Sequence, residues 1–166
     1  GVIYGISGFG LARNLRIPRK EAQAFIDRYF ERFPGIRTYM DDTVAFAKEH
    51  GFVQTLFGRK IHTAEINARG PHAGFAKRAA INAPMQGTAA DIIKKAMLAV
   101  DAWITEQADD RIKMTMQVHD ELIFEIHESI VEETTAKLVE IMNQAVELKV
   151  PLIAEAGIGN NWQQAH

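Results

Sequence analysis

Apolar residues recur every three or four positions in the first third of the chain, the spacing of helices with one buried face. Pro34-Gly35 separates two such stripes and is a pair that ends a helix. The second stripe stops at Gly51, a residue type that commonly follows a helix C-terminus. The pattern therefore predicts two helices, the first beginning near Pro18. The apolar positions of the first helix are Ala22, Phe25, Ile26, Tyr29, Phe30 and Phe33. Those of the second helix are Ile36, Met40, Val44 and Ala47.

The segments on either side of these stripes have a different pattern. Residues 5–10 contain three glycines, and we expect them to turn or break the chain. Residues 52–56 and the basic run 59–62 flank Phe57-Gly58, which predicts a small β-hairpin.

A long helical stretch is predicted in the middle of the chain, after a loop at residues 64–74. It runs from about Phe75 to Ile104. Pro84 lies inside it and has no backbone N–H to donate. The sequence therefore predicts a kink or a break near Ala83.

The last third of the chain mixes strands and a helix. Residues 112–118 and 122–126 have the composition of strands joined by a tight turn. Ser129 and Glu132 have capping-box spacing and predict a helix that continues to about Leu148. Residues 151–156 predict a final short strand. A helical half followed by helix–strand–strand–helix–strand indicates the α+β class, with a small antiparallel sheet and packed helices.

Composition narrows the possible functions. The 166 residues suffice for one domain or two small lobes. The absence of cysteine excludes a disulfide framework, a thiolate zinc site and a cysteine nucleophile. No apolar run approaches the roughly 18 residues that span a bilayer, so we expect a cytoplasmic protein without a membrane partner. The start of the chain has neither Met nor a signal-peptide pattern, and we expect it to lie inside a longer protein.

The net charge of −2 conceals two opposite halves. Residues 1–100 carry 15 Lys and Arg against 8 Asp and Glu, whereas residues 101–166 carry 4 against 13. A basic half joined to an acidic half is typical of a protein that binds a polyanion. The alternative is that each half only solvates its own surface.

The turn between the predicted strands carries His119, Asp120 and Glu121 side by side. Carboxylates on a rigid hairpin suit a hard cation such as Mg²⁺, which takes one or two of them together with water and phosphate oxygens. Because turns also favour Asp, a solvated hairpin tip is the alternative.

Polar side chains also gather on the long predicted helix. Arg78 and Asn82 are four residues apart and share one face, and Gln86 follows four residues later. Arg, Asn and Gln are suited to base edges and phosphates. The alternative is the solvated face of an amphipathic helix.

With these motifs in view, the chain resembles the C-terminal end of the polymerase region of family A DNA polymerases, along nearly its whole length. The resemblance rests on residues 1–10, on the run from Arg78 to Asp91, on Val118-His119-Asp120-Glu121, and on the ending at residues 161–166. It implies part of the fingers followed by part of the palm. Residues 1–75 would be the helical fingers part with its hairpin. Residues 76–166 would be the palm part.

The resemblance also implies roles for single residues. Asp120 matches the aspartate that binds catalytic Mg²⁺, and Glu121 matches its acidic neighbour, which assists catalysis less directly. His119 matches a residue near the primer terminus. Tyr4 matches a tyrosine near the templating base and the incoming nucleotide. The residues expected to contact the primer–template duplex are Arg78, Asn82 and Gln86.

The implied reaction is template-directed addition of a deoxynucleotide to a primer 3′-hydroxyl, with two Mg²⁺ ions. Primer–template DNA and deoxynucleoside triphosphates are the implied partners, and the nucleoid of a bacterial cytoplasm is the implied location.

The family's other metal-binding aspartate lies on an upstream segment. We therefore expect the 166-residue polypeptide to be inactive alone, and its unpaired sheet edges to promote self-association. The alternatives are a non-catalytic duplex-DNA-binding module and a folded remnant that has neither activity nor useful affinity for DNA.

Overall fold

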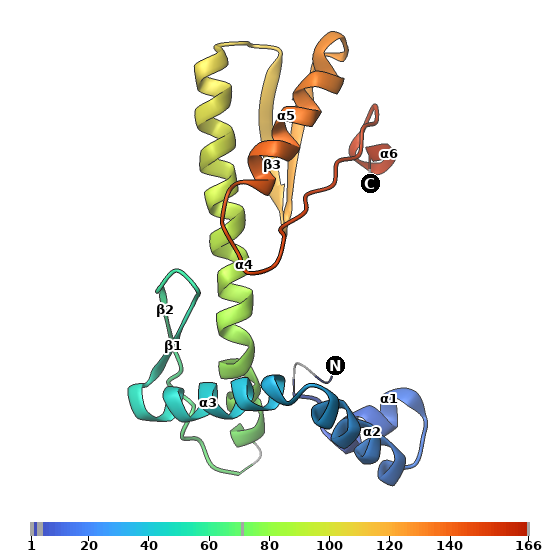
Figure 1. Cartoon of the computed structure of the whole chain (residues 1–166), viewed down its shortest axis with the longest axis vertical. Helices are drawn as coiled ribbons and strands as arrows, with labels where there is room; N and C mark the ends of the chain where they lie inside the picture. Colours follow the sequence, from blue (N-terminus) through green and yellow to red (C-terminus); the bar gives the residue numbers. More distant parts are fainter. Residues whose placement is uncertain (1, 3–4, 71, 166) are drawn as a thin grey trace. The chain divides into compact units, whose positions relative to one another are not determined.

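The computed structural model describes residues 2, 5–70 and 72–165. The chain divides into two compact units, Gly1–Thr88 and Ala89–His166, and the boundary falls inside one long helix. Helices dominate both units, and each unit contains one two-stranded antiparallel sheet (Figure 1). The α+β prediction is therefore confirmed. Assignment of residues 1–75 to fingers and 76–166 to palm remains a prediction. None of the described helices is long and apolar enough to cross a membrane.

The expected turn is present at Gly5, which has φ of 75°, but Gly8 and Gly10 belong to a helix, α1 (Gly8–Leu15), where the prediction was wrong. The hydroxyl of Ser7 accepts a hydrogen bond from the backbone N–H of Gly10 at 3.1 Å and caps the first turn. Leu11 then packs against Ala22 and Ile26 in a buried cluster. Capping and burial together outweigh the weak helix propensity of glycine.

The two predicted helices are present as α2 (Arg19–Arg32) and α3 (Pro34–His50). The first buries only part of its predicted stripe, because Phe25 and Phe33 remain about half exposed. Gly51 ends α3 in the left-handed conformation, with φ of 76°, and its N–H donates to Ala47. This backbone conformation explains the glycine at that position.

The predicted hairpin is confirmed as β1 (Phe52–Gln54) paired antiparallel with β2 (Lys60–His62). Val53 from β1 enters a buried cluster shared with α3 and the long helix that follows. The members of this cluster are Ala47, Val53, Ile66 and Ala80.

Of the kink or break predicted near Ala83, the break is absent, because the long helix α4 (His72–Gln107) continues through Pro84. Side chains bond the backbone carbonyls around the proline. The Tyr39 hydroxyl donates to the carbonyl of Ile81 at 2.9 Å, and the Thr88 hydroxyl donates to that of Pro84. Burial raises the pKa of Tyr39, so this phenol remains a neutral donor at ordinary pH. The helical bond that Pro84 cannot make is the one to the carbonyl of Ala80, and these two contacts bond neighbouring carbonyls of the same turns.

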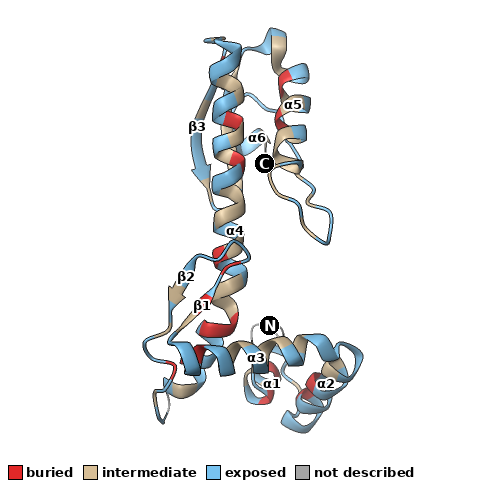
Figure 2. Cartoon of the chain, turned by 60° about the vertical axis from the view of Figure 1, so that its left-hand side comes forward, coloured by how far each residue is buried: buried red, intermediate tan, exposed pale blue. Residues whose placement is uncertain are grey.

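The second unit contains the predicted second hairpin, β3 (Ile112–Val118) and β4 (Glu121–Ile126). Its register is regular from Val118↔Glu121 outwards and shifts between Met114 and Met116. Such a bulge increases the local twist of the hairpin. Figure 2 marks the buried positions of the chain in red, and in this unit they include Ala96, Val100, Ile112 and Leu138.

The C-terminal predictions were less accurate. A single 3₁₀ turn, Glu128–Ile130, is capped by His127 and precedes α5 (Val131–Asn143), which ends before Leu148. Ser129 is therefore inside the turn and is not the helix cap. Residues 151–156 form no strand, and the backbone N–H of Ala154 donates to Asn143 Oδ1 at the end of the preceding helix. A short helix, α6 (Trp162–Ala165), follows. A strand requires a neighbouring strand to bond, which its own sequence does not supply.

Asp109 and Arg111 form an ion pair between α4 and β3. Arg111 Nη2 donates to Asp109 Oδ2 at 2.7 Å, and the backbone N–H of Arg111 donates to Oδ1 at 3.0 Å. Chiefly the side-chain hydrogen bonds lower the pKa of Asp109 from 3.8 to about 2. The folded state thus has the lower pKa. The ion pair between Asp109 and Arg111 therefore stabilises the folded state fully above about pH 4, and this contribution is lost as the pH falls toward 2.

We expect Asp109→Asn to remove this acid-dependent contribution. Urea unfolding of the wild-type and Asp109→Asn polypeptides, measured between about pH 2 and pH 5, is the test. The stability difference between them should shrink as the pH is lowered. A difference that stays constant over this range would show that the pair has no role in acid stability.

Candidate functional site

The β3–β4 hairpin presents its acidic residues at a two-residue turn. His119 and Asp120 form the turn between the paired residues Val118 and Glu121. His119 has φ of 53°. Positive φ at the first turn position is the geometry that hairpin turns of the II′ class use, normally with glycine. The side-chain amide of Gln117 donates to the carbonyl of His119 at 2.6 Å and holds this conformation.

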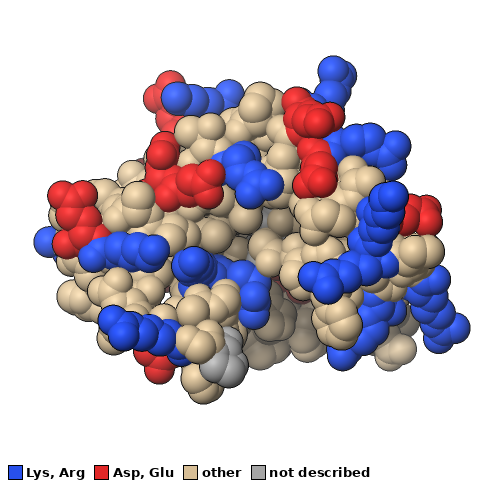
Figure 3. Space-filling view, turned by 90° about the horizontal axis from the view of Figure 1, so that it is seen from below, with Lys and Arg blue, Asp and Glu red and all other residues tan. Residues whose placement is uncertain are grey.

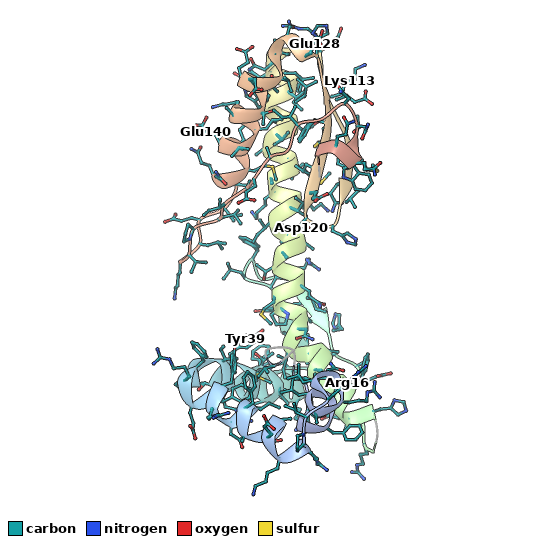
Figure 4. All side chains as sticks on the ribbon, turned by 90° about the vertical axis from the view of Figure 1, so that its right-hand side faces the viewer. Arg16, Tyr39, Lys113, Asp120, Glu128 and Glu140 are labelled. Atoms are coloured by element: carbon teal, nitrogen blue, oxygen red, sulfur yellow. The ribbon has the colours of Figure 1, made fainter. Side chains whose placement is uncertain are left out.

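Asp120 is exposed at the end of the hairpin, as Figure 4 shows, and its carboxylate is accessible to a ligand from solvent. Glu121, the first residue of β4, is half-buried. An exposed carboxylate oxygen on a fixed turn fits a hard divalent cation that takes its other ligands from water and phosphate. Among the residues that the structure describes, no group of three or more His, Asp or Glu is arranged to hold a metal. The turn therefore supplies one part of a metal site.

A second set of candidate residues lies on α4, within the first unit. Arg78, Asn82 and Gln86 follow one another at intervals of four residues and share one face of the helix. Arg78 and Gln86 are exposed, whereas Asn82 is half-buried. Asn82 Oδ1 is buried and has no hydrogen-bond partner in the described part of the chain. On this face, Arg78 and Gln86 therefore offer polar groups to solvent, whereas the amide oxygen of Asn82 is enclosed.

Arg78 is held against the start of the chain. A Cβ placed on Gly5 would lie 3.0 Å from Cγ of Arg78, so the aliphatic part of Arg78 passes directly over that glycine. Gly5 has φ of 75°, a conformation that side chains rarely adopt. Glycine is thus required there on two counts. Tyr4, the predicted nucleotide-binding residue, lies outside the described residues.

The structure also reveals a hollow that the sequence did not predict. It has a volume of about 310 Å³, lies beside Gly5, and is lined in part by Ser7, Phe9 and Arg37. Phe9 is 62% exposed, and Arg37 lies 4.1 Å from the centroid of the Phe30 ring. No sequence pattern indicates this hollow, because Phe9 lines it from α1, a helix that the pattern did not predict.

Basic side chains are widespread on this protein. In the space-filling view they spread across much of the visible face, with acidic side chains mainly along its upper part (Figure 3). Arg19 and Lys20 line a second shallow hollow on α2. The candidate residues therefore fall into two sets, a polar helix face in the basic first unit and a carboxylate turn in the acidic second unit.

Comparison with known proteins relates both sets to one family. Residues 1–164 match the model of DNA polymerase family A. DNA polymerase I of Pseudomonas aeruginosa is 53% identical over the whole chain, which covers 18% of that relative. DNA polymerase I of Rhizobium leguminosarum is 48% identical over the whole chain, which covers 17% of it. The chain thus spans less than a fifth of these curated relatives.

A solved structure also resembles this one closely. It is the polymerase domain of Pol1 from M. smegmatis in complex with DNA primer-template and dNTP. The TM-score is 0.92 at 41% sequence identity, and the match covers 99% of this chain and 29% of that one.

Proposed function

This chain belongs to DNA polymerase family A, and on that premise we propose that it forms part of the active site of a longer DNA-directed DNA polymerase. The observation that carries the proposal is the rigid turn with the exposed carboxylate of Asp120 beside Glu121. The basic unit and its polar helix face, together with the primer-template and dNTP of the related solved complex, support it. If a complete polymerase domain that includes this chain fails to extend a primer, the proposal is wrong.

Each residue of the turn has a distinct proposed role. In the two-metal chemistry of nucleotide addition, bound Mg²⁺ activates the attacking 3′-hydroxyl and stabilises the leaving pyrophosphate. Asp120 would be the residue of this chain that binds the metal directly. Glu121, half-buried at the start of β4, would orient that site, and His119 would contact DNA near the primer terminus. The positive φ of His119 fixes the position of the turn relative to both strands.

The helix face on α4 is the proposed duplex-binding surface. Arg78 would bind the sugar–phosphate backbone, while Asn82 and Gln86 would contact the minor-groove side of the duplex. Acceptors there are similar for A·T and T·A pairs, so contacts with them sense pair geometry and not sequence. A replicative or repair polymerase needs that property. Tyr4 remains the proposed residue next to the templating base.

Replacing Arg78 tests the DNA-binding part of the proposal. In a complete polymerase domain that includes this chain, we expect Arg78→Ala to raise the Kd for primer–template about tenfold and to reduce the salt slope by about one. Fluorescence anisotropy at several salt concentrations measures both quantities. Lys77→Ala is the matched control, because it removes the same charge from a neighbouring face. If both variants weaken binding equally, a specific role for the Arg78 face is excluded.

A non-catalytic duplex-binding module is the second candidate function for the isolated polypeptide. This function is favoured by the division of the chain, because Arg78, Asn82 and Gln86 all belong to the first unit. The turn that carries Asp120 belongs to the second unit. Such a module would bind duplex DNA in a salt-dependent manner, and Asp120→Ala would leave that binding intact.

Three further features of the protein are proposals. We infer that the two-stranded β3–β4 sheet offers open edges through which isolated polypeptides associate. We also infer that the enzyme acts in the bacterial cytoplasm at the nucleoid, because that is where its proposed DNA substrate lies. Residues 1–75 and 76–166 are the proposed fingers and palm parts.

A further inference from the structure

The face of α4 opposite to the proposed DNA contacts is packed against the β1–β2 hairpin. Ala80 is fully buried there with Val53 of β1, and Ala83 and Ile61 pack against the same cluster. Gly87 is buried on this side as well. Helical geometry places Ala80 and Gly87 on the side of α4 away from Arg78 and Asn82, and Ala83 between that side and Gln86. The β1–β2 hairpin therefore packs against the side of α4 that does not carry the proposed DNA contacts.

Two hydrogen bonds fasten the hairpin to this side of the helix. Thr88 Oγ1 accepts from the backbone N–H of Leu56 at 2.9 Å and donates to the carbonyl of Pro84 at 2.6 Å. Arg59 Nη2 donates to the carbonyl of Gly87 at 3.0 Å. We call the turn Thr55–Arg59, together with Gly87 and Thr88, the hairpin clamp. It joins the helix directly after Gln86.

The turn of the hairpin clamp is itself rigid. Thr55 is only 5% exposed, and its backbone N–H donates to the carbonyl of Arg59 at 3.0 Å. The N–H groups of Gly58 and Arg59 donate back to the carbonyl and hydroxyl of Thr55. Gly58 has φ of 83°, which allows the tight reversal. Because the turn is preorganised, it holds α4 in one position at Gly87 and Thr88.

Close packing at Gly87 sets the distance between the hairpin and the helix. A Cβ at this position would lie 2.7 Å from Ile61 Cδ1 and 2.8 Å from Thr55 Cγ2. Both distances are well below normal van der Waals contact. Any side chain at residue 87 would therefore force the side chains of Ile61 and Thr55 to move within the packed hairpin.

We propose that the hairpin clamp is a positioning device for the duplex-reading face, with Thr88 and Arg59 as positioning residues that govern how strictly the primer-terminal base pair is checked. The inference rests on the proposed function of Arg78, Asn82 and Gln86. Minor-groove acceptors report pair geometry only if the donors that meet them are held in place, so a loosened helix would accept a distorted pair more readily.

Thr88→Val tests this role in a complete polymerase domain that includes this chain. The change removes the hydroxyl and keeps the shape. We expect the ratio of matched to mismatched primer extension to fall about threefold to tenfold, with a higher KM for primer–template and a nearly unchanged kcat on matched primers. Thr88→Ser should restore the ratio, because it restores the hydroxyl.

Thr38→Val is the matched control. Thr38 Oγ1 also donates to a proline carbonyl four residues earlier, that of Pro34, at 3.3 Å on an exposed part of α3. Thr38 makes the same kind of local hydrogen bond as Thr88 but does not bond the hairpin. We expect this variant to retain wild-type discrimination. A loss of discrimination equal to that of Thr88→Val would overturn the proposal, because any helix Thr would then have the same effect.

Gly87→Ala provides an independent test that keeps every clamp donor and acceptor. Alanine favours the helix, but its Cβ would displace the side chains of Ile61 and Thr55, and Thr55 belongs to the hairpin clamp. We expect the same loss of discrimination as with Thr88→Val. Unchanged discrimination in both variants, in a domain whose wild type extends primers, would refute the clamp and leave the polymerase function standing. A wild-type domain that extends no primer would refute the polymerase function itself.

Discussion

Asp120→Asn, in a complete polymerase domain that includes this chain, is expected to lower kcat about 10³-fold, the equivalent of about 4 kcal/mol of transition-state stabilisation. An amide has no negative charge and is a far weaker ligand for Mg²⁺ than a carboxylate. The side chain is exposed on a fixed turn, so the substitution should leave the fold intact. Single-turnover incorporation at saturating primer–template, dNTP and Mg²⁺ measures the effect.

Glu121→Gln is the matched control for this experiment. Glu121 carries the same charge one residue later but is half-buried at the start of β4. A residue that orients a metal site without binding the ion directly usually contributes about 10-fold to 100-fold. We therefore expect a smaller loss than for Asp120→Asn, with the Kd for primer–template unchanged in both variants. If Asp120→Asn keeps kcat within tenfold of wild type, Asp120 is not the metal ligand.

The isolated 166-residue polypeptide is expected to give no primer extension above background, the second large effect. A two-metal reaction requires carboxylates that hold both ions, and the β3–β4 turn offers one adjacent pair. The described residues contain no arrangement of three or more metal-ligating side chains. Extension of a labelled primer by purified polypeptide, with Mg²⁺ and all four dNTPs, is the measurement.

The same polypeptide with Asp120→Asn distinguishes true activity from contamination. Incorporation that is present in the wild-type preparation and absent from the variant would disprove the expected inactivity. Incorporation that is equal in both preparations would come from a contaminating polymerase and would leave the prediction intact. Salt-dependent duplex binding without incorporation would support the non-catalytic module for the isolated polypeptide.

Predictions from sequence succeeded where a local signal determined the conformation. Pro34 and Gly51 bound α3, because proline suits the first helical turn and glycine adopts the left-handed conformation that ends it. The β3–β4 hairpin was recognised from two strand-forming runs around a polar turn. Arg78 and Asn82 were placed on one helix face by their spacing alone, and both lie on α4 at that spacing.

The failures share a cause, which is that distant residues decided the outcome. The α1 helix buries Leu11 against α2, and α4 continues through Pro84 where Tyr39 from α3 bonds the carbonyl of Ile81. Residues 151–156 were predicted as a strand from composition, but strand formation requires a partner for the backbone. The half exposure of Phe25 and Phe33 likewise depends on which neighbours cover α2.

The sequence by itself determined the family, the α+β class, most helices and hairpins, and the two sets of candidate functional residues, because periodicity, turn residues and motif spacing are encoded locally. The tertiary structure alone decided that Arg78 rests on Gly5, that Asn82 Oδ1 is buried, and that the hairpin clamp closes on Gly87 and Thr88. Those features arise from close approaches between segments far apart in the chain, and a one-dimensional pattern contains no distances between such segments.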